Sequence, residues 1–322
     1  VCVCVCVCCM CMMYVWFGHM NKPFTFLPVL NFLLFFGGSV YGDDFRDGLD
    51  AANRGDYKTA YKLWLPLAEQ NNAESQFNLG VMYDQGKGVH PSGMRAFKWY
   101  ELSAEQGYPK AQFNLGEIYR EGIIVTRDFE KALKWYRLSA EKGLAEAQCN
   151  LGLMYSEGEG VQQNYKEALK WYRLSAEQGY ALAESNLGLM YEEGQGVQQN
   201  YEEAIKWYSF AAKKGLSGAQ SKLGLMYQSG KGVIQDYKEA VRLYRQSAKQ
   251  GNTIGQKYLG VMYVLGQGVQ KDYVSAHMWF SISGSNGNQN ALNSMRLLEE
   301  KMSQSQINKA QEMVKKWELS EK

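Results

Sequence analysis

The sequence predicts an all-α fold, an α-solenoid of stacked helix-turn-helix repeats, and three observations support this class. From Ser75 to residue 290 the chain repeats itself every 36 residues without a gap. Within each repeat, two segments carry apolar residues at the spacing of one helix face. Glycines separate these two segments. Periods of about 20 to 50 residues are typical of solenoids, whose repeats pack mainly on their neighbours.

The first 42 residues differ from the rest of the chain, because they contain no Asp or Glu and hold six of the seven cysteines. Residues 1–19 begin with "VCVCVCVCC", the alternation that an uninterrupted GT repeat in the gene encodes. We interpret residues 1–19 as upstream or low-complexity translation without a folded role. A functional thiol tract is the alternative.

Residues 20–42 have the composition of a secretory signal peptide. One lysine precedes an apolar stretch at 24–36, and small residues follow it. A proline and an asparagine interrupt this stretch, which is also too short to span a bilayer comfortably. We therefore expect cleavage after Gly42, export to the periplasm or out of the cell, and no stable membrane insertion after cleavage. A membrane-anchored form that keeps residues 1–42 is the alternative.

The charge of the chain is nearly balanced, with 35 Lys and Arg against 33 Asp and Glu. This balance gives no electrostatic reason to expect a nucleic acid or an anionic membrane as the partner. After cleavage the chain keeps one cysteine, Cys149, so no disulfide can form within it even in an oxidising compartment. Other repeats have Phe, Ser or Lys at this position, which predicts a partly exposed helix site without a redox role.

Residues 43–74 align as an N-terminal half-repeat, because Ala60 and Ala68 lie one period before Ala96 and Ala104. Six full repeats follow over residues 75–290, in strict register. Leu-Gly recurs at 79/80, 115/116, 151/152, 187/188, 223/224 and 259/260, and Tyr at 83, 119, 155, 191, 227 and 263.

Each full repeat is predicted to form two helices, and the third repeat shows the pattern. The first helix, within "AQCNLGLMY", places Ala147, Leu151 and Met154 on one face. The second, within "NYKEALKWYRLSAEQG", ends at Gly179, which suits a left-handed C-cap. Two helices of this length cannot bury enough apolar surface alone, so the repeats must stack.

The turn between the two helices reads "YSEGEGVQQNY" in the third repeat and contains Gly158 and Gly160. A dinucleotide-binding fingerprint needs a preceding strand and a third glycine, and that glycine is missing here. We predict instead that Gly158 closes the first helix and Gly160 lets the backbone turn back. Recurrence along the chain favours a structural turn over a phosphate site. The second repeat has Ile124 in place of the second glycine, so we expect its loop to differ.

"AQFNLGEIY" and "LGLMYSEGEGVQQNYKEALKWYRLSAEQG", with their copies, resemble the Sel-one-like repeat, a relative of the tetratricopeptide repeat. The resemblance covers residues 75–290 as full repeats and residues 43–74 as the half-repeat common in bacterial members. It implies a right-handed α/α superhelix with a concave groove. It also implies a scaffold for protein–protein contacts.

Residues 291–322 are predicted to cap the array. Val264 and Leu265 replace a polar pair of earlier repeats, so the last repeat should present an apolar edge to this segment. Ser303 and Gln306 fit a capping box at the start of a helix. The predicted buried stripe of that helix is Ile307, Ala310, Met313, Val314 and Trp317. Capping ends of this kind keep a solenoid soluble, and we expect a monomer.

Candidate catalytic and metal sites do not survive comparison between repeats. "SAEK", from Ser139 to Lys142, matches the Ser-x-x-Lys of penicillin-recognising enzymes, and a cysteine-rich branch of the repeat family is linked to β-lactam binding. Two other repeats read "SAEQ" there, and the cysteine pairs of that branch are missing. Three histidines occur, none with a metal ligand at helical spacing, and His277 is expected to pack or cap within the last repeat. We expect no catalytic residue, metal or cofactor.

One column of residues has the chemistry of a binding surface. Asparagine recurs at one position of the first helix in four repeats, and Lys or Tyr replaces it in the last two. If the first helices line the inner face, these side chains can pair with the backbone of an extended peptide. The alternative is that each asparagine bonds the backbone of the adjacent repeat. The predicted partner-binding residues are Asn78, Asn114, Asn150, Asn186, Lys222 and Tyr258, with Phe77 and Phe113 at the neighbouring variable position.

We therefore expect a non-enzymatic scaffold that binds proteins or peptides in the bacterial envelope or outside the cell. One alternative is an envelope enzyme that acts on β-lactam or peptidoglycan-type substrates. Another is a secreted factor that engages host proteins. A unique Ser, Glu or metal cluster outside the repeat register would favour the enzyme, and the sequence shows none.

Overall fold

The computed structural model describes residues 37–320, and all regular elements within that range are α-helices. Residues 1–19 and most of the predicted leader at 20–42 lie outside the described residues. The helices are α2 (Gly37–Asn53), α3 (Tyr57–Glu69), α4 (Ala73–Gln85), α5 (Gly93–Glu105), α6 (Pro109–Glu121), α7 (Phe129–Glu141), α8 (Ala145–Glu157), α9 (Tyr165–Glu177), α10 (Ala181–Glu193), α11 (Tyr201–Lys213), α12 (Ser217–Ser229), α13 (Tyr237–Lys249), α14 (Thr253–Leu265), α15 (Tyr273–Ser285), α16 (Gln289–Glu299) and α17 (Gln304–Ser320).

The chain divides into two compact units, with the boundary after Leu67. In the first unit the indole of Trp64 on α3 is buried, and its Nε1 donates a hydrogen bond to the Phe45 carbonyl on α2 at 3.2 Å. A Cβ added to Gly48 would lie 2.3 Å from the same Nε1. The glycine therefore lets the two helices approach closely enough for this contact.

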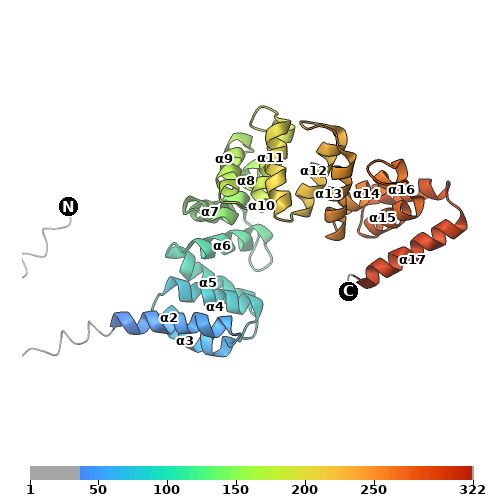
Figure 1. Ribbon diagram of the computed structural model, residues 1–322. Helices are drawn as coiled ribbons and strands as arrows, with labels where there is room; N and C mark the ends of the chain where they lie inside the picture. Colours follow the sequence, from blue (N-terminus) through green and yellow to red (C-terminus); the bar gives the residue numbers. More distant parts are fainter. Residues whose placement is uncertain (1–36, 321–322) are drawn as a thin grey trace, which may run out of the picture. The chain divides into compact units, whose positions relative to one another are not determined.

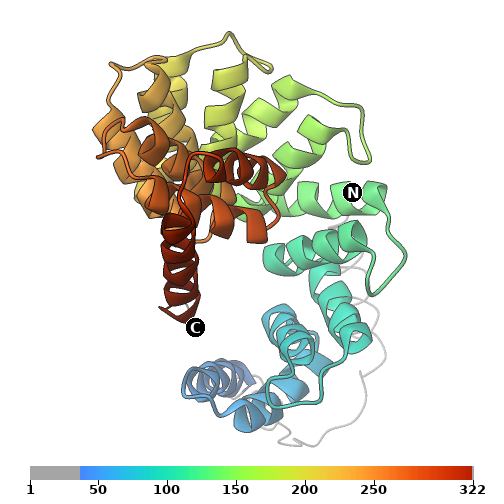
Figure 2. The ribbon, with the colours of Figure 1, turned by 90° about the vertical axis from the view of Figure 1, so that its right-hand side faces the viewer.

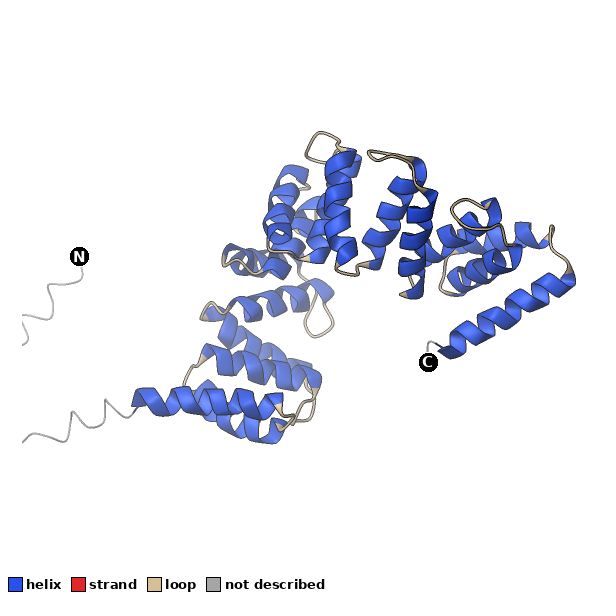
Figure 3. Cartoon of the chain, viewed as in Figure 1, coloured by secondary structure: helices blue, strands red, loops and turns tan. Residues whose placement is uncertain are grey.

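In the second unit, the helices form six consecutive pairs, from α4 with α5 to α14 with α15, and each pair packs on the next (Figures 1 and 3). Figure 2 shows these pairs following one another in chain order. Each pair corresponds to one predicted repeat. The prediction of an all-α solenoid is confirmed.

Within a pair, an aromatic ring of the second helix lies directly on a glycine of the first. In the third repeat a Cβ added to Gly152 on α8 would lie 2.8 Å from the ring of Tyr172 on α9. Tyr172 is buried, as are Leu151 and Met154 of the predicted stripe. The glycine of each Leu-Gly pair is thus needed for close helix packing.

Buried polar side chains tie the helices together through backbone carbonyls. Ser175 on α9 donates its hydroxyl to the Ala145 carbonyl at the start of α8, at 2.6 Å. Gln148 on α8 donates from Nε2 to the Ala140 carbonyl of the preceding repeat at 3.1 Å. The same bonds recur in other repeats, so these buried polar positions are structural.

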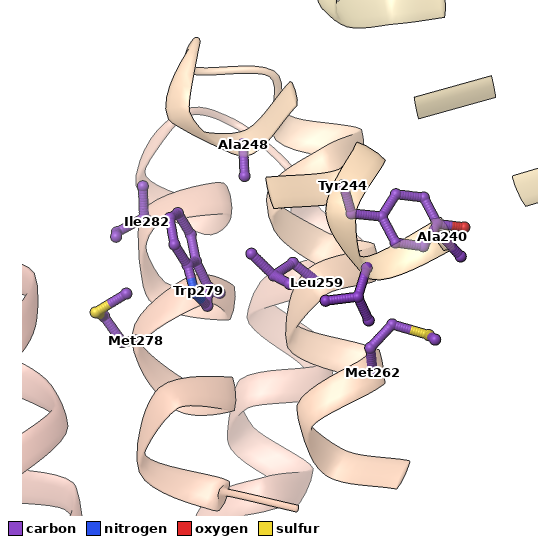
Figure 4. Packing of buried hydrophobic residues seen from close by; sticks show 9 residues of the cluster. Ala240, Tyr244, Ala248, Leu259, Met262, Met278, Trp279 and Ile282 are labelled. Carbon is purple, nitrogen blue, oxygen red and sulfur yellow. The ribbon is translucent and has the colours of Figure 1, made fainter. Parts of the chain in front are cut away.

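The apolar core continues from one repeat into the next. Figure 4 shows a cluster in which Leu259 of α14 lies between Trp279 of α15 and Tyr244 of α13. Because α13 belongs to the fifth repeat and α14 and α15 to the sixth, neither repeat completes this cluster alone. Stacking supplies the missing surface, as expected for a solenoid.

The turn glycines take left-handed conformations, with φ of 77° at Gly158 and 67° at Gly160. Gly158 is the C-cap of α8, as predicted. A Cβ added to Gly160 would lie 2.5 Å from the Phe129 carbonyl oxygen, at the start of the preceding repeat's second helix. The second glycine therefore also permits close packing between repeats.

The second repeat solves this packing problem differently. Ile124 stands in place of the second glycine, and Gly93 stands where later repeats begin their second helix with Tyr or Phe. A Cβ added to Gly93 would lie 3.0 Å from Cγ1 of Ile124. The large and the small residue have thus exchanged places across the same junction.

The C-terminal segment packs on the last repeat. Trp317 of α17 contacts Trp279 of α15 with ring centroids 5.0 Å apart. The predicted capping box is present, because Ser303 N–H donates to Gln306 Oε1 at 2.9 Å and Gln306 N–H donates to Ser303 Oγ at 3.3 Å. Val264 packs against the core beside α16, whereas Leu265 remains 54% exposed. The apolar edge is therefore only partly covered.

No helix within residues 37–320 combines the length and the apolar character needed to cross a membrane.

Candidate functional site

The structure places the predicted column on the first helices of six successive pairs, and every member is half-buried. The members are Asn78 on α4, Asn114 on α6, Asn150 on α8, Asn186 on α10, Lys222 on α12 and Tyr258 on α14.

The two predicted phenylalanines pack against tyrosines of their own repeats. The ring of Phe77 lies 5.8 Å from that of Tyr100 and 5.1 Å from that of Tyr108, measured between centroids. Phe113 lies 5.8 Å from Tyr136 in the same way. Both phenylalanines are half-buried, so each leaves only part of its ring for a partner.

Glu117 on α6 bonds one asparagine of the column and one buried tyrosine. Its Oε1 accepts hydrogen bonds from Nδ2 of Asn150, in the next repeat, and from the hydroxyl of Tyr136. Burial raises the pKa of the Tyr136 phenol well above its ordinary range, and the Glu117 carboxylate raises it further. The phenol therefore remains a neutral donor to the carboxylate.

Asn186 on α10 contacts the preceding repeat through Cys149. Its Nδ2 lies 3.9 Å from the Cys149 sulfur. The prediction that Cys149 occupies a partly exposed position is wrong, because the side chain is only 3% exposed. Burial raises the pKa of the thiol to about 12. The thiol is therefore neutral near pH 7 and a poor nucleophile.

The last two members pair differently. Nζ of Lys222 lies 3.2 Å from Oε2 of Glu192 on α10, which also accepts a hydrogen bond from the Tyr208 hydroxyl at 2.7 Å. The ring of Tyr258 stacks on that of Tyr244 with centroids 5.5 Å apart. Lys222 thus forms an ion pair with Glu192 from the position that asparagine occupies in the first four repeats.

Three members of the column share one kind of partner. Within the described residues, the hydrogen bonds of Asn150, Asn186 and Lys222 run to side chains of the preceding repeat. The alternative prediction placed backbone groups in that role. The three bonds therefore link successive repeats through side chains.

A cleft of about 250 Å³ opens beside Asn186, between α8, α9 and α10. Its apolar lining is Leu153, Leu189 and Met190. Its polar lining is Ser156, Glu157, Gln163, Tyr165, Tyr172, Asn186, Glu193 and Gln195. Asn186 is the member of the predicted column that lines this cleft.

Sequence reasoning missed the two carboxylates of this cleft, Glu157 and Glu193. They occupy the last position of α8 and α10, one period apart. Gln85 stands there in the first repeat and Glu121 in the second, whereas Ser229 and Leu265 stand there in the last two. The carboxylate therefore occurs only in the second, third and fourth repeats, and this restriction was the signal that could have found the pair.

The catalytic candidate has a structural role. Ser139 is fully buried and donates its hydroxyl to the Pro109 carbonyl at 2.8 Å. Nζ of Lys142 donates to the Gly107 carbonyl. Both groups of the Ser-x-x-Lys pattern therefore hold the start of α6 in place.

His277 lies in a second cluster that resembles a catalytic set. Its Nε2 is 2.8 Å from Oε1 of Glu299, and its Nδ1 is 3.3 Å from the Ser281 hydroxyl. The imidazole is only 2% exposed, and Ser281 donates instead to the His277 carbonyl at 2.8 Å. The cluster packs α16 on α15. Within residues 37–320, no group of three His, Cys, Asp or Glu side chains is placed to hold a metal ion.

Comparisons with known proteins agree with this repeat structure. The Sel1 repeat family model matches residues 73–108, 109–144, 145–180, 181–216, 217–252 and 253–288. A search of the curated proteins found no match.

Two solved structures resemble the chain over most of its length. One is a protective antigen present in uropathogenic Escherichia coli strains that displays an SLR fold, 34% identical with a TM-score of 0.74. The match covers 88% of this chain and 62% of that one, so this chain spans less than two thirds of the antigen. The other is a Sel1 repeat protein from Oxalobacter formigenes, 36% identical with a TM-score of 0.70, covering 75% of this chain and 96% of that one.

Proposed function

This chain belongs to the Sel1 repeat family, and we propose that it is a non-enzymatic scaffold that binds a protein or peptide on its first-helix surface. We use "first-helix surface" for the half-buried column from Asn78 to Tyr258 together with the cleft beside Asn186. Members of this repeat family generally serve as protein-interaction modules.

The observation that carries the proposal is a difference between two sets of polar residues. Buried positions such as Ser175 and Gln148 bond helix backbone and hold the repeats together. The asparagine column is half-buried, bonds only side chains in the described examples, and borders a cleft. The first set is needed for the fold, whereas the second offers amides to an incoming chain.

Affinity capture tests this proposal with a double variant. The full chain, its Asn114→Ala/Asn150→Ala variant and a Gln162→Ala/Gln198→Ala control are each used to capture proteins from an envelope extract, with mass spectrometric readout. Gln162 and Gln198 are exposed loop residues one period apart. We expect the native chain and the control to retain a partner that the asparagine variant loses, at an unchanged melting temperature. Equal capture by all three, or a large fall in melting temperature alone, would show that the column is structural.

We also propose that the scaffold acts after export, in the periplasm or outside the cell. The support is the leader-like composition of residues 20–42. Fractionation of the cells that produce the protein tests export, by locating the processed and the unprocessed chain. Processed chain is expected outside the cytosol, and unprocessed chain in the cytosol would contradict export.

A further inference from the structure

The cleft beside Asn186 has a floor and a rim of different chemistry. Leu153 and Leu189 occupy the same repeat position on α8 and α10, and Met190 lies next to the second of them. Glu157 and Glu193 also share a repeat position, at the ends of the same two helices, and both are exposed. An apolar floor with a carboxylate at each of two successive helix ends suits a long side chain with a terminal charge.

The two rim carboxylates have no cationic partner within residues 37–320, whereas their neighbours do. Arg120 pairs with Glu159 at 2.8 Å, and Lys222 pairs with Glu192 at 3.2 Å. Glu193 only accepts a hydrogen bond from Gln195 Nε2, at 2.8 Å. Both of these pairs use carboxylates outside the cleft lining, so Glu157 and Glu193 are the carboxylates of the lining that no described cation pairs.

The remaining polar groups of the cleft are already held in place. Nε2 of Gln163 donates to the Ser156 carbonyl at 2.7 Å and to the Tyr165 hydroxyl at 3.0 Å. The Tyr172 hydroxyl lies 3.3 Å from Ser156 Oγ. Burial raises the pKa of this phenol, the hydrogen bond with Ser156 and the charge of Arg120 lower it, and the charge of Glu157 raises it slightly. Because these groups are already oriented, ligand binding would require little rearrangement of the cleft lining.

We propose that this cleft binds a basic side chain, lysine or arginine, of an extended partner segment. The side chain's methylene groups would lie on Leu153 and Leu189, and its cation would lie between Glu157 and Glu193. A cleft of about 250 Å³ is large enough to admit either side chain. This inference rests on the proposed function, because it names the chemistry that the first-helix surface recognises.

The test uses two labelled peptides and two variants of the full chain. The probes are fluorescein-Gly-Ser-Arg-Ser-Gly-amide and the same peptide with citrulline, which keeps the shape of arginine without its charge. Binding is measured by fluorescence anisotropy at low and at physiological salt. The variant is Glu157→Gln/Glu193→Gln. The control is Glu141→Gln/Glu177→Gln, which removes the same charge from exposed positions at the ends of α7 and α9.

We expect the native chain to bind the arginine peptide about tenfold more tightly than the citrulline peptide, with the difference shrinking as salt rises. The rim variant should lose that preference, and the control should keep it. Equal affinity for both peptides, absence of binding to either, or an unchanged preference in the rim variant would overturn the inference. The proposed function would still stand or fall separately, since it is judged by partner capture and the asparagine variant.

Discussion

Cys149 shows how a single position can be misread when repeats are compared. The position tolerates Phe, Ser and Lys in other copies, yet the thiol is almost fully buried under Asn186 of the next repeat. Exposure also differs among the copies, because Ser221 is buried like Cys149 whereas Phe77, Phe113, Ser185 and Lys257 are half-buried. A redox role is disfavoured by the same burial, which stabilises the neutral thiol.

This burial predicts a pH-dependent contribution to stability. The pKa of the thiol rises from 9.0 to about 12 on folding, so between these values the unfolded thiol ionises while the folded one stays neutral. The contribution of this thiol to the free energy of unfolding is therefore fully present below pH 9. It is lost as pH rises from 9 toward 12, by about 1 kcal/mol per pH unit. Urea unfolding of the native chain and Cys149→Ser at pH 7.5 and pH 10 measures this effect. The free-energy difference between them should shift in favour of the variant at pH 10, and a pH-independent difference would contradict the burial.

At the scale of the helical pair, the turn glycines pack one repeat on another. Gly160, Gly196, Gly232 and Gly268 each approach the residue that begins the preceding second helix. The junction between the first and second repeats uses Ile124 and Gly93 instead. The exchange keeps the junction filled, because one large and one small residue are present in either arrangement.

A double-mutant cycle tests this exchange. Gly93→Tyr should destabilise the chain by roughly 1–3 kcal/mol, because the Cβ of the new side chain would already lie 3.0 Å from Cγ1 of Ile124. Adding Ile124→Gly should recover most of that loss. The free energies of unfolding of both single variants and the double variant give the coupling.

Ile123→Gly is the control for this cycle. Ile123 is 81% exposed, so its effect on the free energy of unfolding should add to that of Gly93→Tyr without coupling. Additive effects of Gly93→Tyr and Ile124→Gly would show that the two residues do not fill the same space.

Sequence patterns predicted most of these elements but not the contacts between them. The C-cap at Gly158 and the capping box of Ser303 and Gln306 depend on residues close in the chain, and the structure confirms both. The cleft of Glu157 and Glu193 depends on the spacing between two repeats. The bond between Asn150 and Glu117 depends on it as well. That spacing is set by packing over many residues, so no local pattern predicts it.

For the second unit as a whole, two kinds of polar column run along the stacked repeats. The buried serine and glutamine columns bond backbone and are equivalent in nearly every repeat. The asparagine column changes to Lys222 and Tyr258 in the last two repeats, and the charge at the ends of the first helices also disappears there. The later repeats therefore present a different surface from the earlier ones, although they have the same fold. We place the partner on the earlier repeats for this reason.

The most direct test of partner binding on the first-helix surface is site-specific photo-cross-linking in the cells that produce the protein. Benzoylphenylalanine is placed at Gln195, which lines the cleft and carries no charge, and in a second strain at Glu177, at the exposed end of α9. We predict a covalent adduct with a partner from position 195 and none from position 177. Adducts from position 177 alone, or from neither position, would contradict the assignment of binding to the first-helix surface.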